Sequence, residues 1–161
     1  MNTPMRELVL LRHAEAESDS HHGDRERPLS AAGGQHAVAA GQWLLAHDCR
    51  PDLIVHSPAI RARATAEAVH AQMPQVRLQA DEGIYEASPG ELLEVLDKHG
   101  TDGLSRVLLV GHNPGLERLL GLLTQGRSGN HRGMLPASIA RIGFDGPIEP
   151  GRGRLLAYWA P

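Results

Sequence analysis

The chain has 161 residues, of which 41% are hydrophobic and 22% charged, and its formal net charge is −3. This composition is typical of a globular domain with a substantial core, so we expect a single domain over residues 1–161. The small negative charge argues against a nucleic-acid partner. No apolar stretch reaches the roughly 18 residues of a membrane-spanning helix, so we expect no membrane partner either.

The histidines and the cysteine give no sign of a metal site or a disulfide. His21 and His22 are adjacent in a polar stretch, and no zinc-binding motif or cysteine cluster accompanies the ten histidines. Cys49 is the only cysteine, and the N-terminal residues lack the apolar region of a signal peptide. We therefore expect exposed loop histidines, no metal or other cofactor, and a cytoplasmic location, and we expect the chain to be a monomer.

Strand and helix patterns alternate along the chain, which indicates an α/β fold. Apolar runs predict strands at residues 7–12, 53–56, 76–78 and 106–111, followed by a late antiparallel pair at 138–144 and 154–159. Amphipathic patterns predict helices at residues 30–46, after residue 58, after residue 88 and at 114–124. The Gly- and Arg-rich segment 125–136 predicts a mobile loop.

Capping residues predict where the helices begin. The expected caps are Ser30, Ser57 with Pro58, the capping box of Ser88 and Glu91, and Asn113 with Pro114. The expected buried face of the first helix consists of Val38, Gly41, Leu44 and Leu45.

The strands at 7–12, 53–56 and 106–111 are continuous apolar runs, which are typical of central strands covered on both faces. We therefore predict a three-layer α/β/α sandwich with a mixed, mostly parallel central sheet. In such sheets, ligands bind beyond the carboxyl ends of the strands. The side chains expected at that edge are Arg12, His13, Arg61 and His112.

These side chains have the chemistry needed to bind and transfer a phosphoryl group. A neutral imidazole is a nucleophile toward phosphorus, and covalent transfer divides one difficult step into two. Two guanidinium groups can bind the non-bridging oxygens and offset the charge that repels the nucleophile. A second imidazole can donate a hydrogen bond as charge shifts in the transition state. Because these cationic side chains supply positive charge, the chemistry requires no metal.

Four sequence motifs resemble the histidine phosphatase superfamily, which has the phosphoglycerate mutase-like fold. They are Leu-Arg-His-Ala at 11–14, Arg-Pro-Leu-Ser-Ala-Ala-Gly at 27–33, Ser-Pro-Ala-Ile-Arg-Ala-Arg-Ala-Thr-Ala at 57–66, and Gly-His-Asn-Pro at 111–114. The short chain and the stretch Ile-Tyr-Glu-Ala-Ser-Pro at 84–89 are similar to the bacterial SixA-type phosphohistidine phosphatases.

The resemblance implies a role for each site residue. It implies that His13 becomes phosphorylated, that Arg12 and Arg61 bind the phosphoryl group, and that His112 completes the pocket. It also implies a substrate, which is phosphohistidine on a signalling protein such as a histidine-containing phosphotransfer domain.

Some positions depart from the family pattern or leave a role open. Ala14 replaces the signature glycine, and its methyl group fits if the residue has a negative φ. Glu86, with Glu82 close by, is a candidate proton donor, although a plain exposed carboxylate is the simpler interpretation. Ser57 is a candidate phosphate ligand, although an N-cap is simpler. Arg63 competes with Arg61 as the phosphate ligand, and we expect it to be an exposed helix residue.

Two other functions stay open. A small-molecule phosphomonoesterase or mutase of the same superfamily would act on a small phosphate ester, with an acid at the site and a lid over it. A non-catalytic phosphate-binding domain would use the same pocket without turnover. In the loop at 125–136, Arg127, His131 and Arg132 are either solvated or in contact with a protein substrate.

Overall fold

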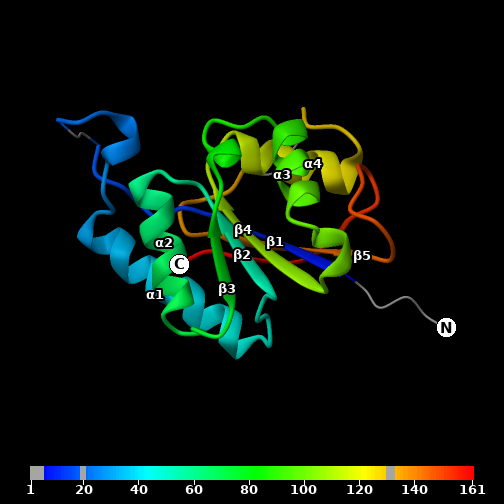
Figure 1. The fold of residues 1–161 in the computed structure, drawn as a ribbon, viewed down its shortest axis with the longest axis horizontal. Coiled ribbons are helices and arrows are strands. Elements are labelled where there is room, and N and C mark those ends of the chain that lie inside the picture. The colour runs from blue at the N-terminus through cyan, green and yellow to red at the C-terminus, as the bar shows by residue number, and fades with distance from the viewer. Residues whose placement is uncertain (1–5, 19–20, 130–132) are drawn as a thin grey trace.

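A computed structural model describes residues 6–18, 21–129 and 133–161 (Figure 1). The strands are β1 (Arg6–Arg12), β2 (Leu53–His56), β3 (Arg77–Ala80), β4 (Arg106–Gly111), β5 (Ile139–Phe144) and β6 (Arg154–Trp159). The helices are α1 (Ala31–Ala46), α2 (Ile60–His70), α3 (Pro89–Lys98) and α4 (Gly115–Gln125). Short 3-10 turns lie at η1 (Asp24–Glu26), η2 (Glu82–Ile84) and η3 (Thr101–Gly103).

The strands form one mixed sheet in the order β3-β2-β4-β1-β5-β6. The strands β3, β2, β4 and β1 run parallel, whereas β5 and β6 are antiparallel to their neighbours. This arrangement confirms the predicted mostly parallel sheet with a late antiparallel pair. It also places β1 in the interior, between β4 and β5.

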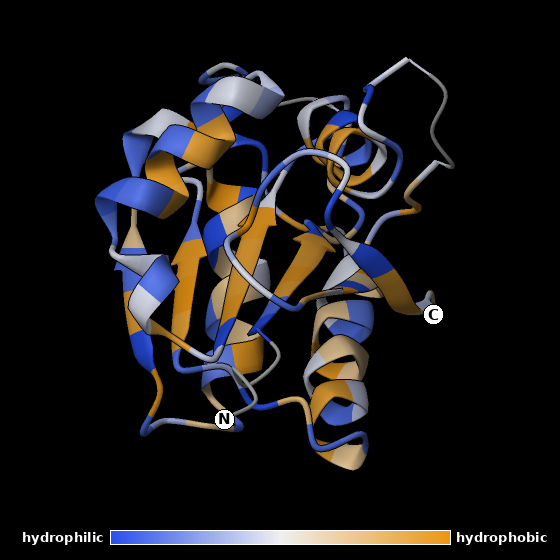
Figure 2. Cartoon of the chain, turned by 90° about the vertical axis from the view of Figure 1, so that its right-hand side faces the viewer, coloured by the Kyte–Doolittle hydropathy of each residue, from blue (hydrophilic) through white to orange (hydrophobic). Residues whose placement is uncertain are grey.

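Helices cover both faces of the sheet, as predicted. Along β1, Leu8 and Leu10 pack into the cluster that includes α3 and α4, whereas Val9 and Leu11 pack into the cluster that includes α1 and α2. Successive side chains of a strand point to opposite faces, so a strand buried on both faces has no polar alternation. Figure 2 shows these hydrophobic strands between helices whose outward faces are polar.

The strand register brings three chain segments to one edge of the sheet. Arg12 pairs with Gly111 across β1 and β4, and His56 pairs with Val110 across β2 and β4. The carboxyl ends of these parallel strands are therefore level. The residues that follow them, His13, Ser57 and His112, begin their loops side by side.

The buried face of α1 differs from the prediction. Gly41 and Leu44 are buried, but Val38 and Leu45 are 43% and 37% exposed, and Ala37 and Ala40 are buried in their place. The reason is close packing of α1 against its neighbours. A Cβ at Gly33 would lie 2.0 Å from the Glu15 carbonyl oxygen in the loop after β1. Small residues therefore face inward, and hydrophobic size is a poor guide to the orientation of this helix.

Two of the four predicted caps are wrong. Ser30 and the Ser88–Glu91 capping box cap α1 and α3 as expected. However, α2 begins at Ile60 and α4 at Gly115, and neither helix has a side-chain cap. The physical reason is that the Ser57 hydroxyl bonds His112 and reaches only the Ala59 N–H, before α2 begins, whereas the Asn113 amide donates to the Met134 carbonyl oxygen.

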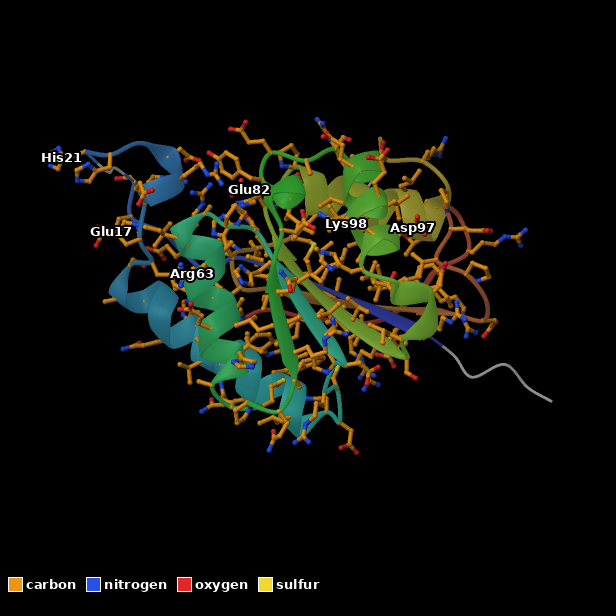
Figure 3. All side chains as sticks on the ribbon, in the orientation of Figure 1. Glu17, His21, Arg63, Glu82, Asp97 and Lys98 are labelled. Atoms are coloured by element: carbon orange, nitrogen blue, oxygen red, sulfur yellow. The ribbon has the colours of Figure 1, made fainter. Side chains whose placement is uncertain are left out.

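The loop histidines and the segment before β5 were also predicted from the sequence. His21 and His22 are exposed, as predicted, and His21 lies at an outer loop in Figure 3. His131 and Arg132 lie outside the described residues, whereas Met134, at the end of the same segment, is buried. Among the described residues, no helix combines the length and the apolar character that crossing a membrane requires.

Candidate active site

The His13 ring is held in one orientation at the end of β1. Its Nδ1 lies 2.8 Å from the Ala14 carbonyl oxygen, and the residue is only 8% exposed. Because a carbonyl oxygen can only accept a hydrogen bond, Nδ1 has the proton and Nε2 has the free lone pair. Ala14 has no positive φ and is fully buried, so its methyl group fits. His13 therefore presents the nitrogen that a nucleophile needs.

His112 lies beside His13, with ring centroids 5.1 Å apart. Its Nε2 is 2.7 Å from the Ser57 hydroxyl, which also accepts the Ala59 N–H at 3.3 Å. We assign the hydroxyl proton to the bond with Nε2, since the Ala59 N–H can only donate and Nε2 is the partner of Ser57 that can accept. This tautomer places the His112 proton on Nδ1, which is buried and has no partner among the described residues.

The two predicted arginines are anchored by their terminal nitrogens. Arg12 donates from Nη1 to the Met134 carbonyl oxygen at 2.9 Å, and Asn113 donates to the same oxygen at 2.9 Å. Arg61 is 5% exposed, and its Nη1 and Nη2 donate to the backbone oxygen and carboxylate of Asp24 at 2.7 and 3.0 Å. Each Nε is buried without a partner in the described part of the chain. Unpaired buried donors are costly, and a bound anion would satisfy them.

The local electrostatics keep both histidines neutral. Burial, followed by the nearby charges of Arg61 and Arg12, lowers the pKa of His13 to about 4. Burial and then the proximity of His13 and Arg61 lower the pKa of His112 to about 3. At neutral pH, His13 is therefore an uncharged imidazole in a field that favours anions.

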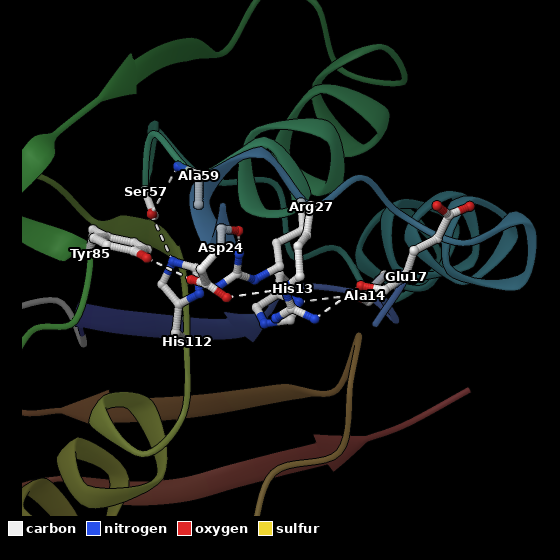
Figure 4. A network of polar contacts seen from close by, with 10 residues as sticks. His13, Ala14, Glu17, Asp24, Arg27, Ser57, Ala59, Tyr85 and His112 are labelled. Carbon is white, nitrogen blue, oxygen red and sulfur yellow. Dashed lines mark hydrogen bonds and ion pairs between the residues drawn. The ribbon is translucent and has the colours of Figure 1, made fainter. Parts of the chain in front are cut away.

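Three residues at the site were missed by sequence reasoning: Asp24, Arg27 and Tyr85. Arg27 donates from Nε to Asp24 and from Nη1 to the Glu17 carbonyl oxygen, both at 3.0 Å. Its charge also lowers the pKa of His13, after burial and the two other arginines. Tyr85 donates its hydroxyl proton to Asp24 at 2.5 Å (Figure 4). Arg27 and Tyr85 each had a signal in the sequence, because they lie in the family-like stretches at 27–33 and 84–89, whereas Asp24 had none.

A cavity of about 520 Å³ extends from Arg61 and His112 along the start of α3 and α4. Glu86 lines this cavity and is exposed, with a left-handed φ of 55°. Glu82 instead pairs with Arg25 at 2.6 Å. Ser57 is fully buried with its hydroxyl engaged by His112. The cavity is larger than a phosphoryl group.

Arg63 does not belong to this group of residues. Its side chain is exposed and pairs with Glu67 one helical turn further along α2, at 2.8 Å. Figure 3 shows it at the outer surface of that helix. Arg63 is therefore an exposed helix residue, as predicted.

Comparisons with known proteins define the class. Residues 8–102 match the model of the histidine phosphatase superfamily (branch 1), and the chain belongs to this family. An uncharacterized protein of Mycobacterium tuberculosis is 29% identical over 162 residues, covering 94% of this chain and 99% of the relative.

Two solved structures extend the likeness to the whole fold. A candidate phosphohistidine phosphatase SixA from Nakamurella multipartitia has a TM-score of 0.85 and 26% identity, covering 100% of this chain and 99% of that one. A second candidate SixA, from Agrobacterium tumefaciens, has a TM-score of 0.82 and 27% identity, covering 98% and 99%.

Proposed function

We propose that this chain is a phosphohistidine phosphatase that acts through a phosphorylated His13. The observation that carries the proposal is the set of polar groups around that ring. Nε2 of His13 has a free lone pair, and the buried N–H donors of Arg12, Arg61 and His112 lack partners in the described structure. We propose that a phosphoryl group beside Nε2 accepts hydrogen bonds from these donors.

The reaction would occur in two displacements. The His13 Nε2 lone pair forms a bond to phosphorus, and the bond from phosphorus to the leaving group breaks with its electron pair on that group. A water molecule then attacks phosphorus, the N–P bond to His13 breaks, and inorganic phosphate leaves. In both steps, Arg12 and Arg61 bind the non-bridging oxygens, and His112 donates to another as charge is redistributed.

Phosphohistidine as the substrate is supported by the chemistry of the leaving group. The N–P bond to an imidazole is labile, so its cleavage does not depend on a strong proton donor. The chain also resembles, over nearly its full length, two structures named as candidate phosphohistidine phosphatases. We propose that the substrate belongs to a protein such as a histidine-containing phosphotransfer domain.

The test is rapid-quench trapping with a phosphotransfer domain labelled with ³²P on histidine. We expect transient, acid-labile label on the protein and release of inorganic phosphate, both lost in His13→Ala. His47→Ala, at an exposed histidine after α1, is the control and should retain both. Label that persists in His13→Ala would refute the nucleophile assignment. Binding of phosphate without any turnover would indicate a non-catalytic phosphate-binding domain.

A small phosphate ester is a second candidate substrate, favoured by the cavity and by Glu86 on its wall. An ester needs its alkoxide leaving group protonated, and a carboxylic acid there would do this. If esters are the substrate, Glu86→Gln should lower kcat for sugar phosphates by about 10²–10⁴-fold. If phosphohistidine is the substrate, the same variant should turn over the labelled phosphotransfer domain at nearly the wild-type rate.

A further inference from the structure

Asp24 makes an unusual number of contacts for a half-exposed side chain. Its carboxylate accepts from Arg61 Nη2 at 3.0 Å, from Arg27 Nε at 3.0 Å and from the Tyr85 hydroxyl at 2.5 Å. Its backbone oxygen accepts from Arg61 Nη1 at 2.7 Å. The 3-10 turn η1 is thereby joined to α2 and to the segment before α3. These contacts lie beside the two histidines (Figure 4).

This arrangement has two possible meanings for an anion-binding site. Asp24 could occupy the place of the substrate and compete with it for Arg61. Alternatively, Asp24 could orient Arg61 and leave other donors for the substrate. The bonded atoms favour orientation. A guanidinium has five N–H donors, and Asp24 takes one from each terminal nitrogen, whereas the Arg61 Nε has no partner among the described residues.

Arg12 shows the same pattern with a different acceptor. Its Nη1 is held by the Met134 carbonyl oxygen, and its Nε also has no partner in the described structure. Both site arginines are thus fixed at a terminal nitrogen with Nε left over. A carbonyl oxygen is not a phosphate analogue, so competition does not explain the pattern at Arg12. Orientation of a planar cation explains both cases.

We propose that Asp24, held by Tyr85, is a positioning residue that orients Arg61 for the phosphoryl group. Tyr85 also contacts His112, because the two rings pack edge-on with their centroids 5.6 Å apart. Arg25 lies over the Tyr85 ring, with its guanidinium carbon 4.8 Å from the ring centroid. One tyrosine therefore contacts both the residue that orients Arg61 and the second histidine.

The inference rests on the proposed function but can be tested without turnover. The first measurement is the affinity for orthovanadate and inorganic phosphate by calorimetry, in wild type, Asp24→Asn and Asp24→Ala. We expect Asp24→Ala to weaken orthovanadate binding by about 10- to 100-fold, because a misaligned group loses its contact with the anion. Asp24→Asn, which keeps one acceptor oxygen, should lose less. A competitor would have the opposite effect, and tighter binding in both variants would overturn the proposal.

The second measurement separates positioning from folding. In Asp24→Ala we expect kcat for the labelled phosphotransfer domain to fall more than KM rises, since oriented charge acts mostly in the transition state. Tyr85→Phe should change kcat in the same direction by a smaller factor. Glu26→Gln is the matched control, because it removes an exposed carboxylate from the same turn, and it should change neither quantity by more than about twofold.

The two proposals fail in different ways. If wild type binds orthovanadate and hydrolyses phosphohistidine while both Asp24 variants match it, only the positioning role is wrong. If wild type hydrolyses neither substrate class, the proposed function is wrong, and the orthovanadate affinities still decide whether Asp24 orients Arg61.

Discussion

The arginine side chains at the two ends of β1 differ in their hydrogen-bond partners. At the amino end, Glu7 accepts paired hydrogen bonds from Arg106 at 3.0 and 3.2 Å and is also bonded by Arg141 at 2.8 to 3.1 Å. At the carboxyl end, Arg12 bonds a neutral carbonyl oxygen and keeps a buried Nε that lacks a partner in the described residues. Both ends are largely buried, so burial alone does not account for the difference.

The pKa shifts show the same contrast. Hydrogen bonds to Glu7 are the main cause that raises the pKa of Arg106 and Arg141. Burial raises the pKa of Glu7, but its bonds with the two arginines outweigh burial and hold the pKa below the usual value. By contrast, burial lowers the pKa of Arg12. The amino end therefore stabilises the fold through paired charges, whereas at the carboxyl end a buried donor of Arg12 has no partner among the described residues.

The largest effect should come from removing a site arginine. We expect Arg61→Met to lower kcat/KM for phosphohistidine by about 10²–10³-fold, the usual cost of losing one donor to the transition state. The free energy of unfolding in urea should change by no more than about 1 kcal/mol, because the variant also removes a buried charge. A large loss of stability with normal activity per folded molecule would place Arg61 with the structural arginines.

The opposite outcome is expected at the amino end. Glu7→Gln removes the carboxylate between two partly buried arginines, and Glu7 is itself only 12% exposed. We expect the free energy of unfolding to fall by about 2–4 kcal/mol, because breaking such a group leaves the cations uncompensated. Activity per folded molecule should stay at the wild-type level in the same assay. An unchanged urea midpoint would contradict the structural role of this end.

The pH dependence of the free energy of unfolding should distinguish the two ends of β1, because His13 and Glu7 lose their contributions in different pH ranges. His13 has a folded pKa of about 4, against 6.5 when unperturbed, so the unfolded state takes up its proton first. Wild-type stability should therefore fall as pH drops from 6.5 towards 4, whereas Glu7, with a lowered pKa, loses its contribution only below about its unperturbed value of 4.5. Between pH 7 and 4.5, wild type should lose about 1–3 kcal/mol more than His13→Asn in urea titrations. Equal losses would argue against a buried neutral His13.

The smallest effect is expected at the exposed Arg63–Glu67 pair on α2. Arg63→Ala should change the free energy of unfolding by less than about 0.5 kcal/mol, since water screens a surface ion pair. Its kcat/KM should equal that of wild type, although Arg63 is two residues from Arg61. A marked loss of activity would extend the site to the outer face of the helix.

Sequence patterns predicted the features that depend on neighbouring residues within one strand or helix. The continuous apolar runs predicted β1, β2 and β4, and their carboxyl ends brought His13 and His112 together as expected. The caps at Ser57 and Asn113 could not be predicted this way, because each side chain also bonds a residue that is distant in the sequence, His112 and Met134 respectively. Asp24 and Tyr85 lie 61 residues apart, and only the folded chain shows that they bond.

The interior position of β1 has a consequence for how the protein is made. The first strand pairs with β4 and β5, which lie about a hundred residues or more further along the chain. A nascent chain therefore cannot complete the surroundings of β1 until β5 has been synthesised. Prematurely terminated products ending before Ile139 would lack the antiparallel neighbour of β1 and expose its apolar edge. Such fragments should aggregate or be degraded, so that the pocket is assembled only after translation has passed β5.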